Sequence, residues 1–155
     1  MTLTRRAFLA GAAGLAAAAP LAVRAEAALS IHVLKDPNCG CCTAWIDILD
    51  AAGFRVTTEA RDGNALMRHK LESGIPPEMV SCHTASIDGY MVEGHVPVAD
   101  IRRLVTERPN AIGLAVPGMP FGSPGMGPEE EREAYAVFLI RQDGGAEIFS
   151  RYPAG

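Results

Sequence analysis

Three of the four cysteines in this sequence crowd into four consecutive positions. Cys39, Cys41 and Cys42 form a C-x-C-C motif, and Cys82 follows forty residues later. Cys39 and Cys42 have the C-x-x-C spacing of redox dithiols, whereas adjacent Cys41 and Cys42 would bridge only through a strained ring. A purely structural disulfide therefore does not account for three clustered thiols. Because the thiolate is both a nucleophile and a metal ligand, the motif by itself leaves redox chemistry and metal binding open.

The residues on either side of the motif predict a strand before it and a helix after it. Residues 30–34 are short, apolar and partly β-branched, which is typical of a buried strand. From Thr43 onward apolar residues recur at helical spacing, and Gly53 suits the position that ends a helix. The cysteines would then lie at a helix N-terminus. The aligned backbone amides there favour anions and should lower the pKa of the thiols.

The rest of the chain continues this α/β pattern. After a break at residues 75–77, Asp88-Gly89 is the preferred two-residue turn of a β-hairpin, and Pro97 suits the first turn of a helix. Four Pro and four Gly in residues 117–128 exclude a helix or central strand there. The predicted elements are strands at 55–60, 79–87, 90–96 and 111–116, helices at 64–72 and 98–107, and a last hairpin of 134–141 with 146–152.

This order predicts a thioredoxin-like α/β fold with a mixed sheet flanked by helices. A dithiol between the first strand and first helix, with a later proline before a hairpin, is the thioredoxin arrangement. The early strand–helix–strand unit implies a parallel pair with a right-handed crossover. The Pro/Gly/Met loop and the C-terminal hairpin are additions to that core.

The third clustered thiol favours a soft metal over dithiol exchange. A dithiol oxidoreductase gains little from Cys41, whereas thiolates bind Cu(I) and clustered sulfurs can bridge several Cu(I) ions. Cys82 is expected on the strand after the proline break, which starts beside the dithiol in this type of fold. Cys82 could complete a four-sulfur set or be an ordinary buried cysteine. The spacing leaves both readings open.

Two other metals compete with copper on the cysteine pattern. A zinc site usually has two ligand pairs at C-x₂₋₄-C spacing, and adjacent Cys82 and His83 would make a poor second pair. An iron–sulfur cluster could use four cysteines, but the spacing matches neither common ferredoxin pattern. Both metals are therefore less favoured.

Other soft or borderline donors are weaker candidates. Met119 and Met126 lie in the Pro/Gly loop, where thioethers suit Cu(I) but equally suit packing over an apolar surface. His95 ends a predicted strand and is the best histidine candidate, whereas His83 is expected on the opposite sheet face from Cys82. His32 and His69 are assigned to packing or solvent contact.

Residues 1–27 have the layout of a cleaved secretory signal, which leaves residues 28–155 as one domain. Arg5-Arg6 precede an uncharged Ala/Gly/Leu run, and Ala25-Glu26-Ala27 supplies a small-residue cleavage pattern. The Arg-Arg pair before Phe8-Leu9 favours the twin-arginine export route. The mature protein is then expected in the periplasm, with no membrane span.

The charge balance excludes one broad class of function. Without residues 1–27, Lys+Arg falls from 14 to 11 and Asp+Glu from 18 to 17, which gives a net charge of −6. A protein that tracks nucleic-acid phosphates needs a basic surface. No nucleic-acid partner is expected.

Beyond these patterns, the chain resembles the bacterial periplasmic copper-resistance proteins called CopG, which are unrelated to the ribbon-helix-helix repressor of that name. The match runs over most of residues 30–155 and includes no departure at the cysteines. The segments that carry it are 35–42, 75–77, 81–85, 89–97, 100–101, 107–109, 113–120 and 122–126.

The resemblance implies a thioredoxin-like fold with a thiolate-bound copper cluster and a role in periplasmic copper tolerance. It carries over Cys39, Cys41, Cys42 and Cys82 as ligands and suggests redox interconversion of Cu(I) and Cu(II), which would make the protein a copper-dependent oxidoreductase. His95, Met119 and Met126 are auxiliary candidates that would cap the site or receive copper. Copper ions and other periplasmic copper-handling proteins are the expected partners.

Two alternatives stay open beside copper binding. The first is a periplasmic thiol–disulfide oxidoreductase in which Cys39 attacks and Cys42 resolves. The second is a non-catalytic domain with a Cys39–Cys42 disulfide and two idle thiols. The second leaves Cys41 unexplained and ranks last.

Overall fold

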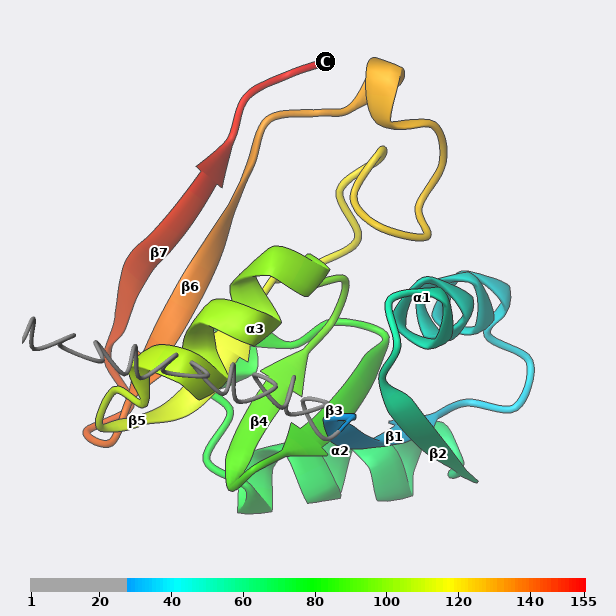
Figure 1. The fold of residues 1–155 in the computed structure, drawn as a ribbon. Coiled ribbons are helices and arrows are strands. Elements are labelled where there is room, and N and C mark those ends of the chain that lie inside the picture. Colours follow the sequence, from blue (N-terminus) through cyan, green and yellow to red (C-terminus); the bar gives the residue numbers. More distant parts are fainter. Residues whose placement is uncertain (1–27) are drawn as a thin grey trace, which may run out of the picture.

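Seven strands form one mixed sheet in a computed structural model that describes residues 28–155 (Figure 1). The predicted signal segment, residues 1–27, lies outside the described part. The sheet order is β2-β1-β3-β4-β5-β6-β7. The strands are β1 (Ser30–Lys35), β2 (Arg55–Ala60), β3 (His83–Ile87), β4 (Tyr90–Glu93), β5 (Ala111–Ala115), β6 (Tyr135–Arg141) and β7 (Ala146–Tyr152), and the helices are α1 (Gly40–Ala51), α2 (Gly63–Glu72) and α3 (Val98–Glu107).

The first four strands form the thioredoxin-like part of the sheet and confirm the predicted fold class. β1 and β2 are parallel and joined through α1, while β3 is antiparallel to both β1 and β4. Helices α1 and α3 lie on one side of the sheet and α2 on the other (Figure 1). β5 is parallel to β4, and the β6–β7 hairpin extends the sheet beyond it, as predicted for an addition to the core.

Side chains alternate between two apolar layers along the central strands. Leu114 of β5 belongs to the large core under α1 and α3, whereas neighbouring Ala115 packs with Ile75 and Ile140 on the opposite face. In the large core Trp45 is fully buried, and its indole N–H donates to the carbonyl of Val96 at 2.9 Å. This bond satisfies the polar atom of a buried ring. It fixes the first turns of α1 to the segment before α3.

The start of the third strand differs from the sequence prediction. The strand predicted from residue 79 begins at His83, because Pro77–Met79 forms a 3₁₀ turn. The backbone N–H of Ser81 is bonded to the Glu93 carboxylate and its carbonyl to the Lys70 ammonium. Because these two backbone groups are hydrogen-bonded to side chains, Ser81 does not pair with a neighbouring strand of the sheet. Cys82 therefore lies in a bend before β3.

Two further boundaries differ by three residues: α1 begins at Gly40 rather than at Thr43, and β4 ends at Glu93 rather than at residue 96. The remaining predicted elements are confirmed to within one or two residues, and α3 matches the predicted helix at both ends. Residues 117–128 form neither a helix nor a ladder strand, as their Pro and Gly content predicts. Over residues 28–155, the structure has no helix with the length and hydropathy needed to span a bilayer.

Candidate metal centre

A tight turn places the C-x-C-C motif at the N-terminus of α1. The Asp36 carboxylate accepts from the backbone N–H of Asn38 at 2.8 Å, and the Asp36 carbonyl accepts from that of Cys39 at 3.1 Å. Cys39 is therefore the N-cap residue, and Cys41 and Cys42 lie in the first helical turn. The unbonded backbone N–H groups of a helix N-terminus carry partial positive charge and favour thiolates over thiols.

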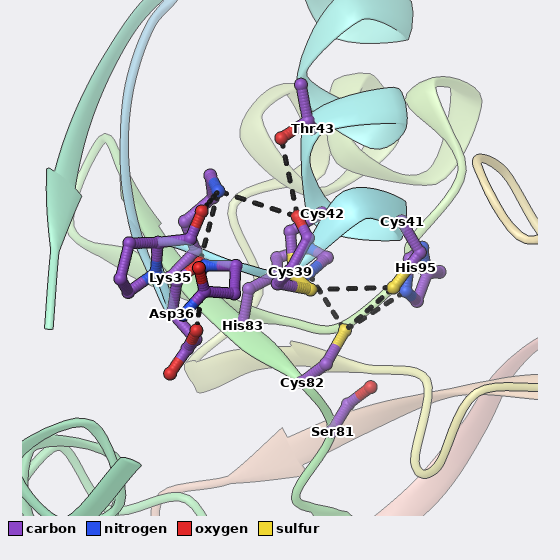
Figure 2. Close-up of a disulfide and its surroundings, with 12 residues drawn as sticks. Lys35, Asp36, Cys39, Cys41, Cys42, Thr43, Ser81, Cys82, His83 and His95 are labelled. Carbon is purple, nitrogen blue, oxygen red and sulfur yellow. Dashed lines mark hydrogen bonds between the residues drawn. A yellow bond between two sulfur atoms is a disulfide. The ribbon is translucent and has the colours of Figure 1, made fainter. Parts of the chain in front are cut away.

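The four cysteines come together at this helix end, as Figure 2 shows. Cys39 and Cys42 form a disulfide, and within residues 28–155 Cys41 and Cys82 are the free thiols. The Cys41 sulfur lies 3.5 Å from the Cys39 sulfur and 4.0 Å from the Cys82 sulfur. All four sulfurs lie within 4.8 Å of one another. The structure thus brings together every cysteine that the sequence nominated as a ligand.

Two histidines extend the cluster on the Cys82 side. The Cys82 sulfur lies 3.1 Å from Nε2 of His95 and 3.3 Å from Nδ1 of His83 (Figure 2). The placement of His95 agrees with its nomination as the best histidine candidate. The expectation for His83 is wrong: because Cys82 lies in a bend, strand alternation does not separate the two side chains. His32 instead bonds Thr57 across the β1–β2 pair.

Burial sets the protonation of this part of the site. Burial lowers the pKa of His83 well below its ordinary value, and it lowers that of His95 as well. Burial and the neighbouring Cys41 raise the pKa of Cys82 to about 11. Near neutral pH both imidazoles are therefore neutral, the form that ligates metals, and Cys82 is a thiol that must lose a proton to bind one.

A buried ion pair holds the backbone that carries Cys82. Lys70 and Glu93 are 2% and 0% exposed, and Nζ lies 2.6 Å from Oε1. Lys70 also donates to the Ser81 carbonyl at 2.6 Å, and Glu93 accepts from the Ser81 N–H at 2.7 Å. This arrangement, in which the Lys70–Glu93 pair clamps the backbone of Ser81, was not predicted from the sequence. A signal was present, because Glu93 ends an otherwise apolar strand and a buried carboxylate needs a partner.

The Pro/Gly/Met loop, residues 117–128, contacts both segments that carry the cysteines. Its start pairs with the backbone before Cys82, since the Gly118 N–H donates to the Val80 carbonyl at 3.2 Å. Gly125 lies against the first two turns of α1: a Cβ there would meet the backbone nitrogen of Trp45 at 2.8 Å, and its φ is +84°. The loop contains the two methionine candidates, Met119 and Met126. Met119 is 53% exposed and Met126 is half-buried.

The donors fit soft and borderline transition metals better than hard ones. Thiolates select Cu(I), zinc and iron–sulfur clusters, and imidazole suits zinc and copper, whereas magnesium and calcium require oxygen ligands. The sulfurs are also close enough together to bridge ions. The geometry therefore supports metal binding at the same cysteines that would perform dithiol chemistry.

The comparisons with known proteins agree with this chemistry. Residues 79–126, which include Cys82 and His95, match a family described as proteins of unknown function, DUF411. The sequence has no match among the curated proteins. Two solved structures named copper resistance protein CopG align with most of the chain. Form 2 is 47% identical, with a TM-score of 0.75 over 81% of this chain and 99% of its own.

Form 1 of that copper resistance protein gives the same picture. It is 46% identical to this chain, with a TM-score of 0.76 over 82% of this chain and 99% of its own length. Identity at this level over nearly the whole length of the relatives, together with the cysteine cluster, establishes the family and a copper-related role. The chain belongs to the CopG family of copper resistance proteins.

Proposed function

We propose that this protein supports copper tolerance by holding more than one Cu(I) ion in a thiolate cluster. The ligands would be Cys39, Cys41, Cys42 and Cys82 after reduction of the Cys39–Cys42 disulfide. The observation that carries the proposal is that four sulfurs from two distant segments lie within 4.8 Å of one another. A dithiol enzyme needs two of them, whereas bridging several Cu(I) ions uses all four.

The same disulfide supplies a route between Cu(II) and Cu(I). The thiolates of Cys39 and Cys42 would each give one electron to a Cu(II) ion and then join as the disulfide, so that two Cu(II) become two Cu(I). In the reverse direction two Cu(I) would reduce the disulfide and leave as Cu(II). The closed disulfide beside two free thiols supports this step, because it is one end state of that exchange.

An anaerobic Cu(I) titration of the reduced protein against a competing chelator tests the cluster. We expect several tightly held Cu(I) per chain, and fewer in both the Cys41→Ser and the Cys82→Ser variants. Thr43→Ser is the matched control, because Thr43 lies exposed on the same helical turn and serine keeps its hydroxyl. Unchanged affinity and stoichiometry in Cys41→Ser would reject the cluster.

A thiol–disulfide oxidoreductase is the second candidate function. It is favoured by one observation, the Cys39–Cys42 disulfide at the N-terminus of the first helix of a thioredoxin-like fold. In this case Cys39, the half-buried thiol, attacks and buried Cys42 resolves. Insulin reduction above background that survives in Cys41→Ser and Cys82→Ser would favour this function over copper storage.

We further propose that the protein works in the periplasm after removal of residues 1–27, with copper ions and other periplasmic copper-handling proteins as its partners. The support is the Arg5-Arg6 pair, the uncharged run after it and the small residues before position 28. Mass spectrometry of the periplasmic fraction should find a chain that begins near residue 28. Exclusive recovery of the uncleaved chain from the cytoplasm would overturn this placement.

A further inference from the structure

A second set of donors remains when the disulfide is closed. Cys82, His83 and His95 each offer one ligand atom, and these three atoms lie within 4.8 Å of one another. None of the three takes part in the disulfide. We propose that the disulfide form of the protein binds one Cu(II) ion through the Cys82 sulfur, Nδ1 of His83 and Nε2 of His95.

His95 is held in the orientation that a ligand needs. Its Nδ1 lies 2.8 Å from the carbonyl oxygen of Pro124. A carbonyl only accepts, so Nδ1 carries the proton and donates it, and Nε2 presents its lone pair toward the Cys82 sulfur, 3.1 Å away. Metal-ligating histidines commonly use the second ring nitrogen in this way, which fixes the tautomer and the ring. The Pro/Gly/Met loop supplies this bond.

The buried His83 ring turns one nitrogen toward the Cys82 sulfur. The side chain is fully buried, its Nδ1 faces Cys82 at 3.3 Å, and its Nε2 has no hydrogen-bond partner in residues 28–155. The ring is packed against Trp45, with centroids 4.4 Å apart, and edge-on to His95 at 5.0 Å. A metal ion held between Nδ1 and the Cys82 sulfur would replace the contact between these two atoms, and Nε2 would then carry the ring proton.

The chemistry of the set selects a borderline divalent ion rather than Cu(I). Two imidazoles and one thiolate form the His₂Cys donor set that proteins use for copper in electron-transfer sites. Binding would release the Cys82 proton to solvent and transfer no electron. Cys82 belongs to both donor sets, so Cu(II) in the disulfide form and the Cu(I) cluster in the reduced form would alternate. The choice of copper rests on the proposed function, whereas the site rests on the three side chains.

The site can be tested in protein whose Cys39–Cys42 disulfide is intact. A Cys41→Ser background removes the second free thiol, so that Cu(II) cannot be reduced by forming a Cys41–Cys82 disulfide. We expect one Cu(II) per chain, a thiolate-to-copper charge-transfer absorption, and electron paramagnetic resonance couplings from two imidazole nitrogens. His95→Ala in this background should lose one nitrogen coupling and at least about tenfold in affinity. His69→Ala on α2 is the control and should change neither.

A second measurement does not depend on the His95 variant folding. Zn(II) is added to the unsubstituted disulfide form, and the imidazole ¹⁵N signals are followed by NMR. We expect the signals of His83 and His95 to shift while those of His32 and His69 stay in place. Unshifted His83 and His95 signals, or Cu(II) spectra that are identical in His95→Ala, would overturn the second site. The Cu(I) titration uses reduced protein, so either proposal can fail without the other.

Discussion

Cys82 is the residue on which both donor sets depend. Its sulfur faces Cys41 on α1 and the two imidazoles of His83 and His95 on the strand side. Burial lowers the pKa of both imidazoles and raises the pKa of the Cys82 thiol, so the imidazoles are neutral and the thiol is protonated. The three side chains are therefore uncharged in the metal-free protein, and only Cys82 becomes charged when a metal displaces its thiol proton.

Burial of neutral His83 predicts a pH-dependent stability of the metal-free protein. The pKa of His83 is lowered in the folded state and returns to about 6.5 on unfolding, so between these values the unfolded chain binds more protons. Stability is therefore fully present above about pH 6.5 and falls as the pH drops below it, by at most about 1.4 kcal/mol per pH unit. Urea unfolding at neutral and at mildly acidic pH should show a steeper loss for the unsubstituted protein than for His83→Gln. Equal slopes would contradict the assignment.

At the scale of the elements, three segments must meet to form the site. The first turn of α1 supplies Cys41, the bend before β3 supplies Cys82, and the Pro/Gly/Met loop orients His95 through Pro124. Side-chain bonds rather than the sheet ladder fix the bend, because the buried Lys70–Glu93 pair takes both backbone groups of Ser81.

The clamp predicts a large loss of stability when one of its partners is removed. Lys70→Met leaves the buried Glu93 carboxylate without its cation and should lower the free energy of unfolding by about 3–5 kcal/mol. Lys70→Met combined with Glu93→Leu removes both charges and should cost less than the single variant. Glu147→Gln, which breaks an exposed pair with Arg141, should change stability far less than either. Chemical unfolding measures all three, and a harmless Lys70→Met would refute the clamp.

The seating of the loop on α1 predicts a specific effect at Gly125. A Cβ at this position would lie 2.8 Å from the backbone nitrogen of Trp45 and 3.1 Å from the Cys41 carbonyl oxygen. Gly125→Ala should therefore lower the melting temperature more than Gly144→Ala. Gly144 has nearly the same φ, +81°, but a Cβ there would meet no atom within 4 Å, so its substitution carries the backbone cost alone. Equal losses for the two variants would show that the loop does not press on the helix.

At the scale of the whole molecule, the fold could be predicted because local patterns agree with it. The apolar segment before the motif, the helical spacing after it and the Asp-Gly turn each specify one element, and their order is that of a thioredoxin-like domain. The Cys39–Cys42 disulfide is local, and the sequence already offered that pairing. The closeness of Cys82 to Cys41, in contrast, depends on packing between distant segments. The sequence therefore identified the four cysteines as candidate ligands but could not predict the distance between Cys82 and the other three.

The main errors, in the start of the third strand and in the face of His83, have one physical origin. The sequence pattern extends the third strand back to residue 79 and so puts His83 on the face opposite Cys82. A buried ion pair between Lys70 on α2 and Glu93 on β4 overrides that pattern, because it withdraws Ser81 from the ladder. Such long-range polar contacts have no local signature. The same contact that shortens the strand turns Cys82 toward the cluster.

The measurement that tests the central claim most directly is X-ray absorption at the copper edge, on reduced protein loaded anaerobically with Cu(I). We predict copper surrounded by sulfur, together with a copper–copper scattering path that is lost in Cys82→Ser and kept in Thr43→Ser. Copper bound by nitrogen and oxygen alone, or by sulfur with no copper neighbour, would contradict a polynuclear thiolate cluster shared by α1 and Cys82.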